Sequence, residues 1–109
     1  MPTETPIKIH SHDVTEGPAK AGARAMLRAV GLGENDFAKP QVGVVSAGTV
    51  VTPCNLTGPK LSARAREGVS VAGGVGLVFS SIAVSYGIAL GHEGMGGSLV
   101  SREVIADSV

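Results

Sequence analysis

The stretch Gly68–Gly91 contains no charged side chain, and it constrains the fold more than any other feature of the sequence. An uncharged run of this length is long enough to cross a lipid bilayer as a single helix. The clustered glycines Gly73, Gly74 and Gly76, together with four serines in the same run, instead favour the end of a helix followed by a buried strand. We therefore expect no membrane span, and we keep a small membrane peptide as the disfavoured alternative.

The composition restricts the class of protein further. The nine basic and nine acidic side chains of the 109 residues cancel, so nothing in the charge balance favours nucleic acid. A hydrophobic content of 43% is too high for a disordered chain. The aromatic residues are Phe37, Phe79 and Tyr86 alone, so the core must pack Val, Leu, Ile and Ala or take apolar area from a partner. Cys54 is the single cysteine and residues 1–17 lack a signal-peptide pattern, which favours the cytoplasm.

The first half of the chain predicts an arm, a helix and a strand. Met1–Gly17 is polar and is expected to be an extended arm. Pro18 suits the first turn of a helix that runs to about Val30, before Gly31 and Gly33 end it. The apolar run 41–46 then predicts a buried strand.

The second half predicts helix, strand and helix. A helix is expected from Lys60 to about Val71, and a second strand over Leu77–Ser85. Gly91–Gly97 is predicted to be a flexible loop, with Ser98 capping a last helix that runs toward Val109. The order indicates an α/β fold, an incomplete three-layer unit with a short, mainly parallel sheet flanked by helices. Because the last helix runs into the chain end, we expect residues 18–109 to be a partial domain, truncated at its C-terminus.

Cys54 is the strongest candidate in the sequence for a metal-binding or reactive side chain. It follows the first predicted strand in a Thr-Pro-Cys-Asn loop, and α/β proteins place ligands at the carboxyl edge of parallel strands. The competing interpretation is an inert buried thiol, because free cysteine behaves as a small hydrophobe. One cysteine cannot hold an iron–sulfur cluster, which usually takes four protein ligands. Any cluster would need ligands from outside this chain.

Other polar residues carry weaker signals. The residues His10, His12 and His92 lack the spacing of a zinc site and are expected to be solvated. The glycines before the last helix could hold an anion on backbone N–H groups, although flexibility is the favoured interpretation. Arg102 could bind a carboxylate or phosphate, or simply face solvent.

A set of short stretches, taken in order and at matching spacing, resembles a known family. The stretches are SHDVTEG (11–17), GARAMLRAVG (22–31), DFAKPQVGV (36–44), TPCNL (52–56), EGVSVAGG (67–74), GHEGM (91–95) and SLVSREVIADSV (98–109). Over about Ser11–Val109 the chain resembles the N-terminal portion of dihydroxy-acid dehydratases, in the wider family that includes sugar-acid dehydratases. The TPCN loop and the SLVSREVIADS helix favour the dihydroxy-acid branch.

The resemblance implies a lyase that removes water from a 2,3-dihydroxy acid to give a 2-keto acid in isoleucine and valine biosynthesis. It implies an iron–sulfur cluster whose open iron acts as a Lewis acid on the departing hydroxyl, and a magnesium ion near the substrate carboxylate. Cys54 matches the family's first cluster cysteine. The full-length protein is expected to be a homo-oligomer that binds a small-molecule dihydroxy acid.

The departures from the family pattern matter equally. Tyr86 stands where the family's Ser-Asp-Gly-Ile has a magnesium-ligand aspartate, and a neutral phenol is a poor magnesium ligand. The stretch 48–50 is Gly-Thr-Val instead of Trp-Asn-Glu, and Val78 replaces a glutamate. The other cluster cysteines and the catalytic base lie downstream in the family. We therefore assign no catalytic residue and expect the chain alone to be inactive and to hold neither cluster nor magnesium stably. The alternative is a non-enzymatic assembly module that pairs with a full-length dehydratase.

Overall fold

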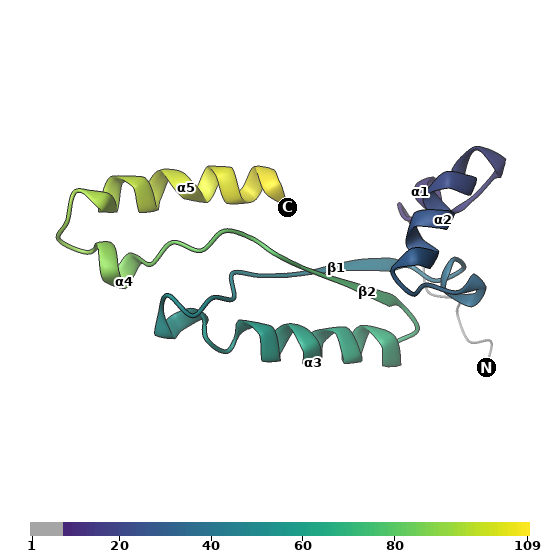
Figure 1. Cartoon of the computed structure of the whole chain (residues 1–109), viewed down its shortest axis with the longest axis horizontal. Helices are drawn as coiled ribbons and strands as arrows, with labels where there is room; N and C mark the ends of the chain where they lie inside the picture. The colour runs from purple at the N-terminus through teal and green to yellow at the C-terminus, as the bar shows by residue number, and fades with distance from the viewer. Residues whose placement is uncertain (1–7) are drawn as a thin grey trace. The chain divides into compact units, whose positions relative to one another are not determined.

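The computed structural model describes residues 8–109 and has a mixed α/β fold, as expected (Figure 1). Short 3-10 turns at Pro18–Lys20, Glu34–Asp36 and Pro53–Asn55 accompany the main elements. Two compact units can be distinguished by their internal contacts: unit 1 comprises Met1–Gly43 and Arg66–Leu77, and unit 2 comprises Val44–Ala65 and Val78–Val109. The main elements are α1 (His12–Thr15), α2 (Ala21–Ala29), β1 (Gln41–Ser46), α3 (Gly58–Val71), β2 (Val75–Ser80), α4 (Tyr86–Ala89) and α5 (Gly94–Ser108).

Strands β1 and β2 form a two-stranded parallel sheet. The Val75 N–H donates to the Pro40 carbonyl at 2.9 Å, and the Ser81 N–H donates to the Ser46 carbonyl at 3.0 Å. The same residue offset at both ends of the ladder identifies the parallel register. The predicted strand over residues 41–46 is confirmed in its bounds, but the prediction that it is buried is wrong, since Val42 and Val45 are 41% and 40% exposed.

The second strand is displaced from its predicted position, Leu77–Ser85. Helix α3 ends at Val71, as predicted, in a Schellman motif in which the Gly74 N–H donates to the Val69 carbonyl at 2.9 Å and Gly73 has a φ of +89°, so the strand can begin directly afterwards at Val75. The strand ends at Ser80 because β1 ends at Ser46 and offers no further ladder partner.

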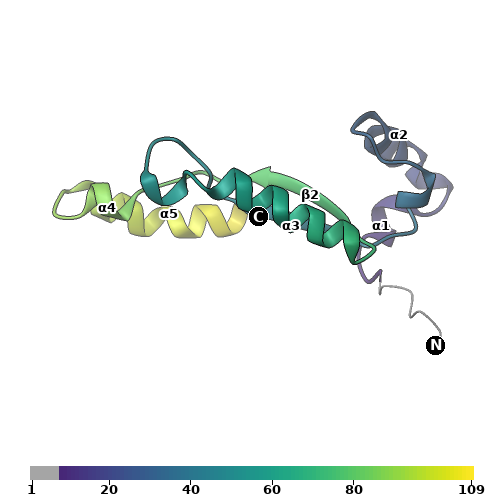
Figure 2. The same ribbon diagram turned by 90° about the horizontal axis from the view of Figure 1, so that it is seen from below.

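Helix α3 connects the two strands and lies along them in both views (Figures 1 and 2). Its contact with β2 is close at Gly76, where an added Cβ would lie 2.9 Å from Cγ and 3.2 Å from Cα of Arg66. Glycine is therefore needed at this strand position for the helix backbone to approach.

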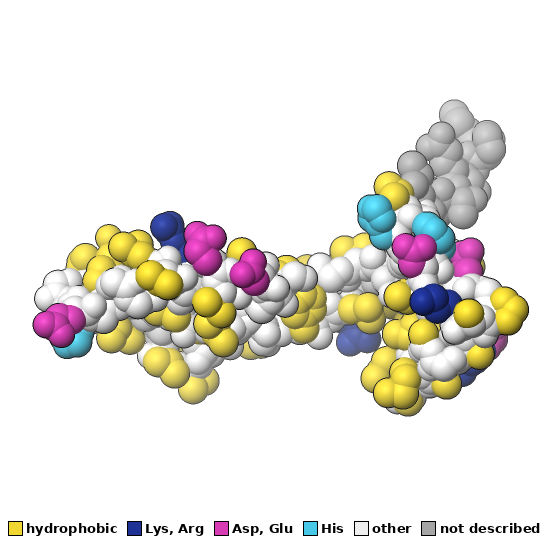
Figure 3. Space-filling view, turned by 90° about the horizontal axis from the view of Figure 1, so that it is seen from above, with side chains coloured by type: hydrophobic (Ala, Val, Ile, Leu, Met, Phe, Trp, Pro, Cys, Tyr) yellow, Lys and Arg dark blue, Asp and Glu magenta, His cyan; other side chains and the backbone are white. Residues whose placement is uncertain are grey.

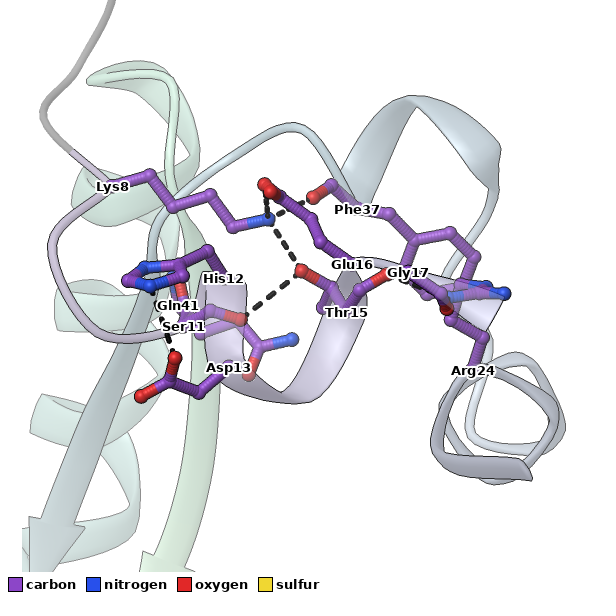
Figure 4. Close-up of polar contacts among 10 residues, drawn as sticks. All are labelled: Lys8, Ser11, His12, Asp13, Thr15, Glu16, Gly17, Arg24, Phe37 and Gln41. Carbon is purple, nitrogen blue, oxygen red and sulfur yellow. Dashed lines mark hydrogen bonds and ion pairs between the residues drawn. The ribbon is translucent and has the colours of Figure 1, made fainter. Parts of the chain in front are cut away.

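The predicted extended arm over Met1–Gly17 is wrong for part of its length. Residues 1–7 lie outside the described residues, but His12–Thr15 form the one-turn helix α1. Thr15 is buried, and its Oγ1 donates to the Ser11 carbonyl at 3.0 Å. The Arg24 guanidinium covers the end of the turn by donating to the carbonyls of Thr15 and Gly17 at 3.0 and 2.7 Å (Figure 4). These bonds favour helical backbone where the composition alone indicated an arm.

Phe37 is 7% exposed and is the one large hydrophobic side chain among residues 8–109 that is buried. The Lys8 ammonium donates to the Phe37 carbonyl and to Thr15 Oγ1, and pairs with Glu16 at 3.2 Å (Figure 4). Arg28 lies over the Phe37 ring, with its Cζ 5.0 Å from the ring centroid. The buried aromatic ring of unit 1 thus has a guanidinium over it.

The C-terminal part of unit 2 corrects two further predictions. Gly91–Gly97 is not a loop throughout, because α5 begins at Gly94, and Ser98 is buried inside that helix instead of capping it. The N-cap of α5 is Glu93, whose side chain makes no capping bond, and the His92 Nδ1 accepts a hydrogen bond from the Gly94 N–H at 3.0 Å. The four-residue helix α4, absent from the sequence prediction, packs against α5.

Many large apolar side chains of unit 2 are exposed. Hydrophobic groups spread over the visible surface of the α4–α5 region (Figure 3). They include Leu61 on α3 and Ile82, Ile88 and Leu99 in the C-terminal part, each 45–66% exposed. None of the helices described over residues 8–109 is long and apolar enough to cross a membrane.

Candidate functional site

Cys54 is exposed in the middle of the short 3-10 turn Pro53–Asn55, in the loop that follows β1. Pro53 occupies the start of the turn, where its fixed φ is already suitable and its missing N–H costs nothing. The Leu56 N–H closes the turn on the Pro53 carbonyl at 3.4 Å. The alternative of a buried thiol at this position is therefore wrong, and the sulfur is available to a ligand.

The side chain of Asn55 fixes the loop around Cys54. Its Nδ2 donates to the Ala47 carbonyl at 2.7 Å, and its Oδ1 accepts from Thr52 Oγ1 at 2.9 Å. The backbone adds a bond from the Thr49 N–H to the Asn55 carbonyl at 3.3 Å. Because Thr52 is only 2% exposed, its hydroxyl depends on this internal partner. We call Ala47–Leu56 the cysteine loop.

The cysteine loop also packs closely on the start of α3. A Cβ added to Gly58 would lie 2.8 Å from Cα of Gly48, and a Cβ added to Gly48 would lie 2.8 Å from Cδ of Pro59. Two glycines thus allow the loop backbone to contact the helix start directly. The loop that presents Cys54 is therefore held in place by the side-chain hydrogen bonds of Asn55 and by backbone packing against α3.

Tyr86, the residue at the family's magnesium-ligand position, lies elsewhere in unit 2. It is the first residue of α4, whose N-cap Ser85 accepts a hydrogen bond from the Ile88 N–H at 3.2 Å. The phenol ring is more than half exposed and lines a groove together with Arg102 of α5. No residue of the cysteine loop lines that groove.

The three histidines are all exposed, which agrees with the sequence prediction. His12 pairs with Asp13 at 3.0 Å, and the His92 Nδ1 accepts from the Gly94 N–H at 3.0 Å. Within residues 8–109 no three His, Cys, Asp or Glu side chains are grouped closely enough to hold a metal ion.

The groove beside Tyr86 is the feature that sequence reasoning missed. Ser98, Ser101 and Ile105 lie on one face of α5 at helical spacing, and this spacing was the available signal. The sequence analysis started this helix at Ser98, whereas α5 starts at Gly94, so the first helical turn was not predicted.

Comparison with known proteins identifies the family. Residues 39–109 match the family described as "Dihydroxy-acid/6-phosphogluconate dehydratase N-terminal". The chain belongs to this dehydratase family. It is 61% identical over 103 residues to a dihydroxy-acid dehydratase of Mycobacterium avium, covering 94% of this chain and 18% of the relative. It is 60% identical over 109 residues to one of Nocardioides sp., covering 99% of this chain and 19% of the relative. A Mycobacterium bovis dihydroxy-acid dehydratase is 59% identical over 107 residues.

The chain spans less than a fifth of the length of these dehydratases. An exposed thiol on a loop held by hydrogen bonds is suited to bind a soft metal as one of several ligands. The cysteine loop therefore fits a role as the source of one ligand in a cluster of the kind that the resemblance implies. The Tyr86 position does not fit magnesium, because its groove offers no carboxylate and its one charged lining side chain is the cationic Arg102.

Proposed function

We propose that this chain forms the N-terminal part of a dihydroxy-acid dehydratase, a lyase that removes water from 2,3-dihydroxy acids to give 2-keto acids in isoleucine and valine biosynthesis. Within it, Cys54 supplies one cysteine ligand of an iron–sulfur cluster. The observation that carries the proposal is the exposed thiol on a loop braced by Asn55, in a chain about 60% identical to proteins named dihydroxy-acid dehydratase. As the resemblance implies, the full-length form is expected to be a cytoplasmic homo-oligomer.

The chemical contribution of this chain is a positioned thiolate. When bound, the cluster supplies a Lewis acid for the departing hydroxyl group. The bonds of Asn55 hold the cysteine loop in place before metal binding, so less conformational entropy is lost when the sulfur binds. The other ligands and the general base are proposed to come from polypeptide outside this sequence. The 109-residue chain alone is therefore expected to be inactive.

Magnesium binding is not proposed at Tyr86. A phenol is a poorer ligand than a carboxylate for a hard divalent cation, which prefers anionic oxygens. We expect Tyr86→Asp to improve magnesium-dependent function only in a longer protein that supplies the remaining oxygen ligands.

A chimaera tests the proposal. Residues 1–109 are joined to the part of the Mycobacterium avium relative that follows the matched region, and dehydration of a 2,3-dihydroxy acid is measured with and without Tyr86→Asp. The proposal predicts no activity for the 109-residue chain and activity for the chimaera carrying Tyr86→Asp. A folded chimaera that is inactive in both forms contradicts it.

The exposed apolar side chains of unit 2 favour a second candidate, an assembly module that pairs with a full-length dehydratase. Ile82, Ile88 and Leu99 present apolar area of the kind that interfaces bury. Co-expression with the Mycobacterium avium relative, followed by size-exclusion chromatography, tests it. Co-elution supports pairing, and a monodisperse 10.9 kDa species beside the free relative rejects it.

A further inference from the structure

A polar pocket of about 170 Å³ lies within unit 1, between the segment that follows α2 and the junction of α3 with β2. Asp36, Lys39, Arg66 and Ser70 contribute to its lining. Because a water molecule takes up about 30 Å³ in the liquid, the pocket has room for a small polyatomic ion. Cys54 is not part of the lining, so the pocket is separate from the cysteine loop.

Arg66 supplies a cationic group that has no protein partner. Its side-chain stem lies against β2 at Gly76, where an added Cβ would be 2.9 Å from the Arg66 Cγ. Within residues 8–109 the guanidinium makes no hydrogen bond or ion pair. A planar guanidinium with free N–H groups is suited to bind an oxyanion through two parallel hydrogen bonds.

The one carboxylate of the pocket lining, that of Asp36, is already paired. Lys39 Nζ donates to its Oδ1 at 2.8 Å, and the Gly33 N–H donates to its Oδ2 at 2.8 Å. The Lys39 ammonium keeps further N–H donors beyond this pair. Because the charges of Asp36 and Lys39 cancel, Arg66 gives the lining a net positive charge.

The chemistry of the lining disfavours a metal cation, although α2 and α3 both end at the pocket. The last carbonyls of α2 accept from the N–H groups of residues 30–32, and those of α3 accept from residues 72–74. The Ser70 hydroxyl, in contrast, has no protein partner in the described part of the chain and can donate. The free side-chain groups of the lining are thus chiefly donors, at Arg66, Lys39 and Ser70.

We propose that this pocket binds a small divalent inorganic oxyanion of the sulfate and phosphate type, with Arg66 as its main partner and Lys39 and Ser70 as further donors. A halide ion has no second oxygen for the parallel bonds of the guanidinium. An apolar ligand would leave both cationic groups unpaired. The site does not involve Cys54 and is independent of the proposed cluster.

Calorimetric titration of the 109-residue chain with sodium sulfate tests the proposal, with sodium chloride at matched ionic strength as the comparison. Saturable binding is expected for sulfate and none for chloride. Arg66→Gln keeps the Cβ and Cγ that pack on Gly76 and is expected to weaken sulfate binding at least about tenfold, equivalent to ~1.4 kcal/mol. Ser70→Ala, which leaves the guanidinium in place, is expected to weaken it by less.

A matched variant controls for net charge. Lys20→Gln removes an exposed cation of unit 1 that does not line the pocket, and it is expected to bind sulfate as the parent chain does. No saturable binding of sulfate, undiminished binding by a folded Arg66→Gln, or an equal loss for Lys20→Gln overturns the proposal. Because the cluster proposal rests on Cys54, none of these results affects it.

Discussion

The Asn55 side-chain amide donates a hydrogen bond of 2.7 Å to the Ala47 carbonyl, across the base of the cysteine loop. The same side chain accepts from the buried Thr52 hydroxyl at 2.9 Å. One asparagine thus satisfies a backbone acceptor and a buried donor, and Cys54 lies directly before it in the sequence. The position of the thiol depends on this side chain.

Asn55→Ala is expected to destabilise the protein by about 1–3 kcal/mol, because it leaves the Thr52 hydroxyl and the Ala47 carbonyl without their partner. Urea denaturation followed by circular dichroism measures the change. The exposed Asn35 provides the control, and Asn35→Ala is expected to change stability by less than about 0.5 kcal/mol. Equal effects of the two substitutions would show that Asn55 does not brace the loop.

Two glycines of α3 are expected to respond oppositely to alanine. Gly58→Ala places a Cβ 2.8 Å from Cα of Gly48 and should cost about 1–3 kcal/mol, because backbone must move. Gly68→Ala meets no atom within 4 Å and should stabilise the helix by about 0.5–1 kcal/mol. Thermal unfolding of both variants measures the pair. A gain in stability for Gly58→Ala is incompatible with the described loop–helix contact.

Phe37→Leu should destabilise unit 1 by about 1–2 kcal/mol, since it removes the ring that Arg28 covers and leaves unfilled space. Phe79 is 39% exposed, so Phe79→Leu is expected to cost less than about 0.5 kcal/mol. Denaturant midpoints of both variants test the difference. A larger loss at Phe79 would place the core elsewhere.

Asp36 is expected to make the folding stability depend on pH in the acid range. Its hydrogen bond with Lys39 at 2.8 Å, and a second from the Gly33 N–H, hold the pKa of the Asp36 carboxyl below its usual value of 3.8. The folded state therefore releases this proton more readily than the unfolded state. The stabilisation is complete above the ordinary carboxyl pKa and is lost as the pH falls through the lower folded value.

Asp36→Asn removes this acid dependence. The difference in melting temperature between parent and variant should be present at about pH 7 and vanish toward about pH 2. Thermal unfolding across this range measures it. A difference that persists unchanged at the acid end would mean that the Asp36 charge does not contribute.

Local sequence rules predicted the helices and strands whose ends are marked by glycine or proline. Gly31, with a φ of +100°, ends α2 in the Schellman motif that its sequence indicated, and β1 follows Pro40 as expected. The prediction failed where distant residues decide. The start of β2 depends on the Val75 N–H donating to the distant Pro40 carbonyl, and α1 depends on Arg24 donating to the carbonyls of Thr15 and Gly17.

The sequence also predicted the candidate site only in part. The position of Cys54 after a strand identified the residue, but its exposure and the bonds of Asn55 follow from a loop conformation that no local pattern specifies. The groove at Tyr86 requires the segment with Val84 and Tyr86 to lie against α5, and no local pattern predicts this contact between separate segments.

The central claim is that Cys54 ligates a cluster. Its most direct test is the iron and sulfide content of the anaerobically reconstituted chimaera described above, compared with its Cys54→Ser variant, with circular dichroism confirming that both are folded. The account predicts a stoichiometric cluster with visible absorbance in the parent chimaera and its loss in the Cys54→Ser variant. Equal iron, sulfide and absorbance in the two folded proteins would contradict the role assigned to Cys54.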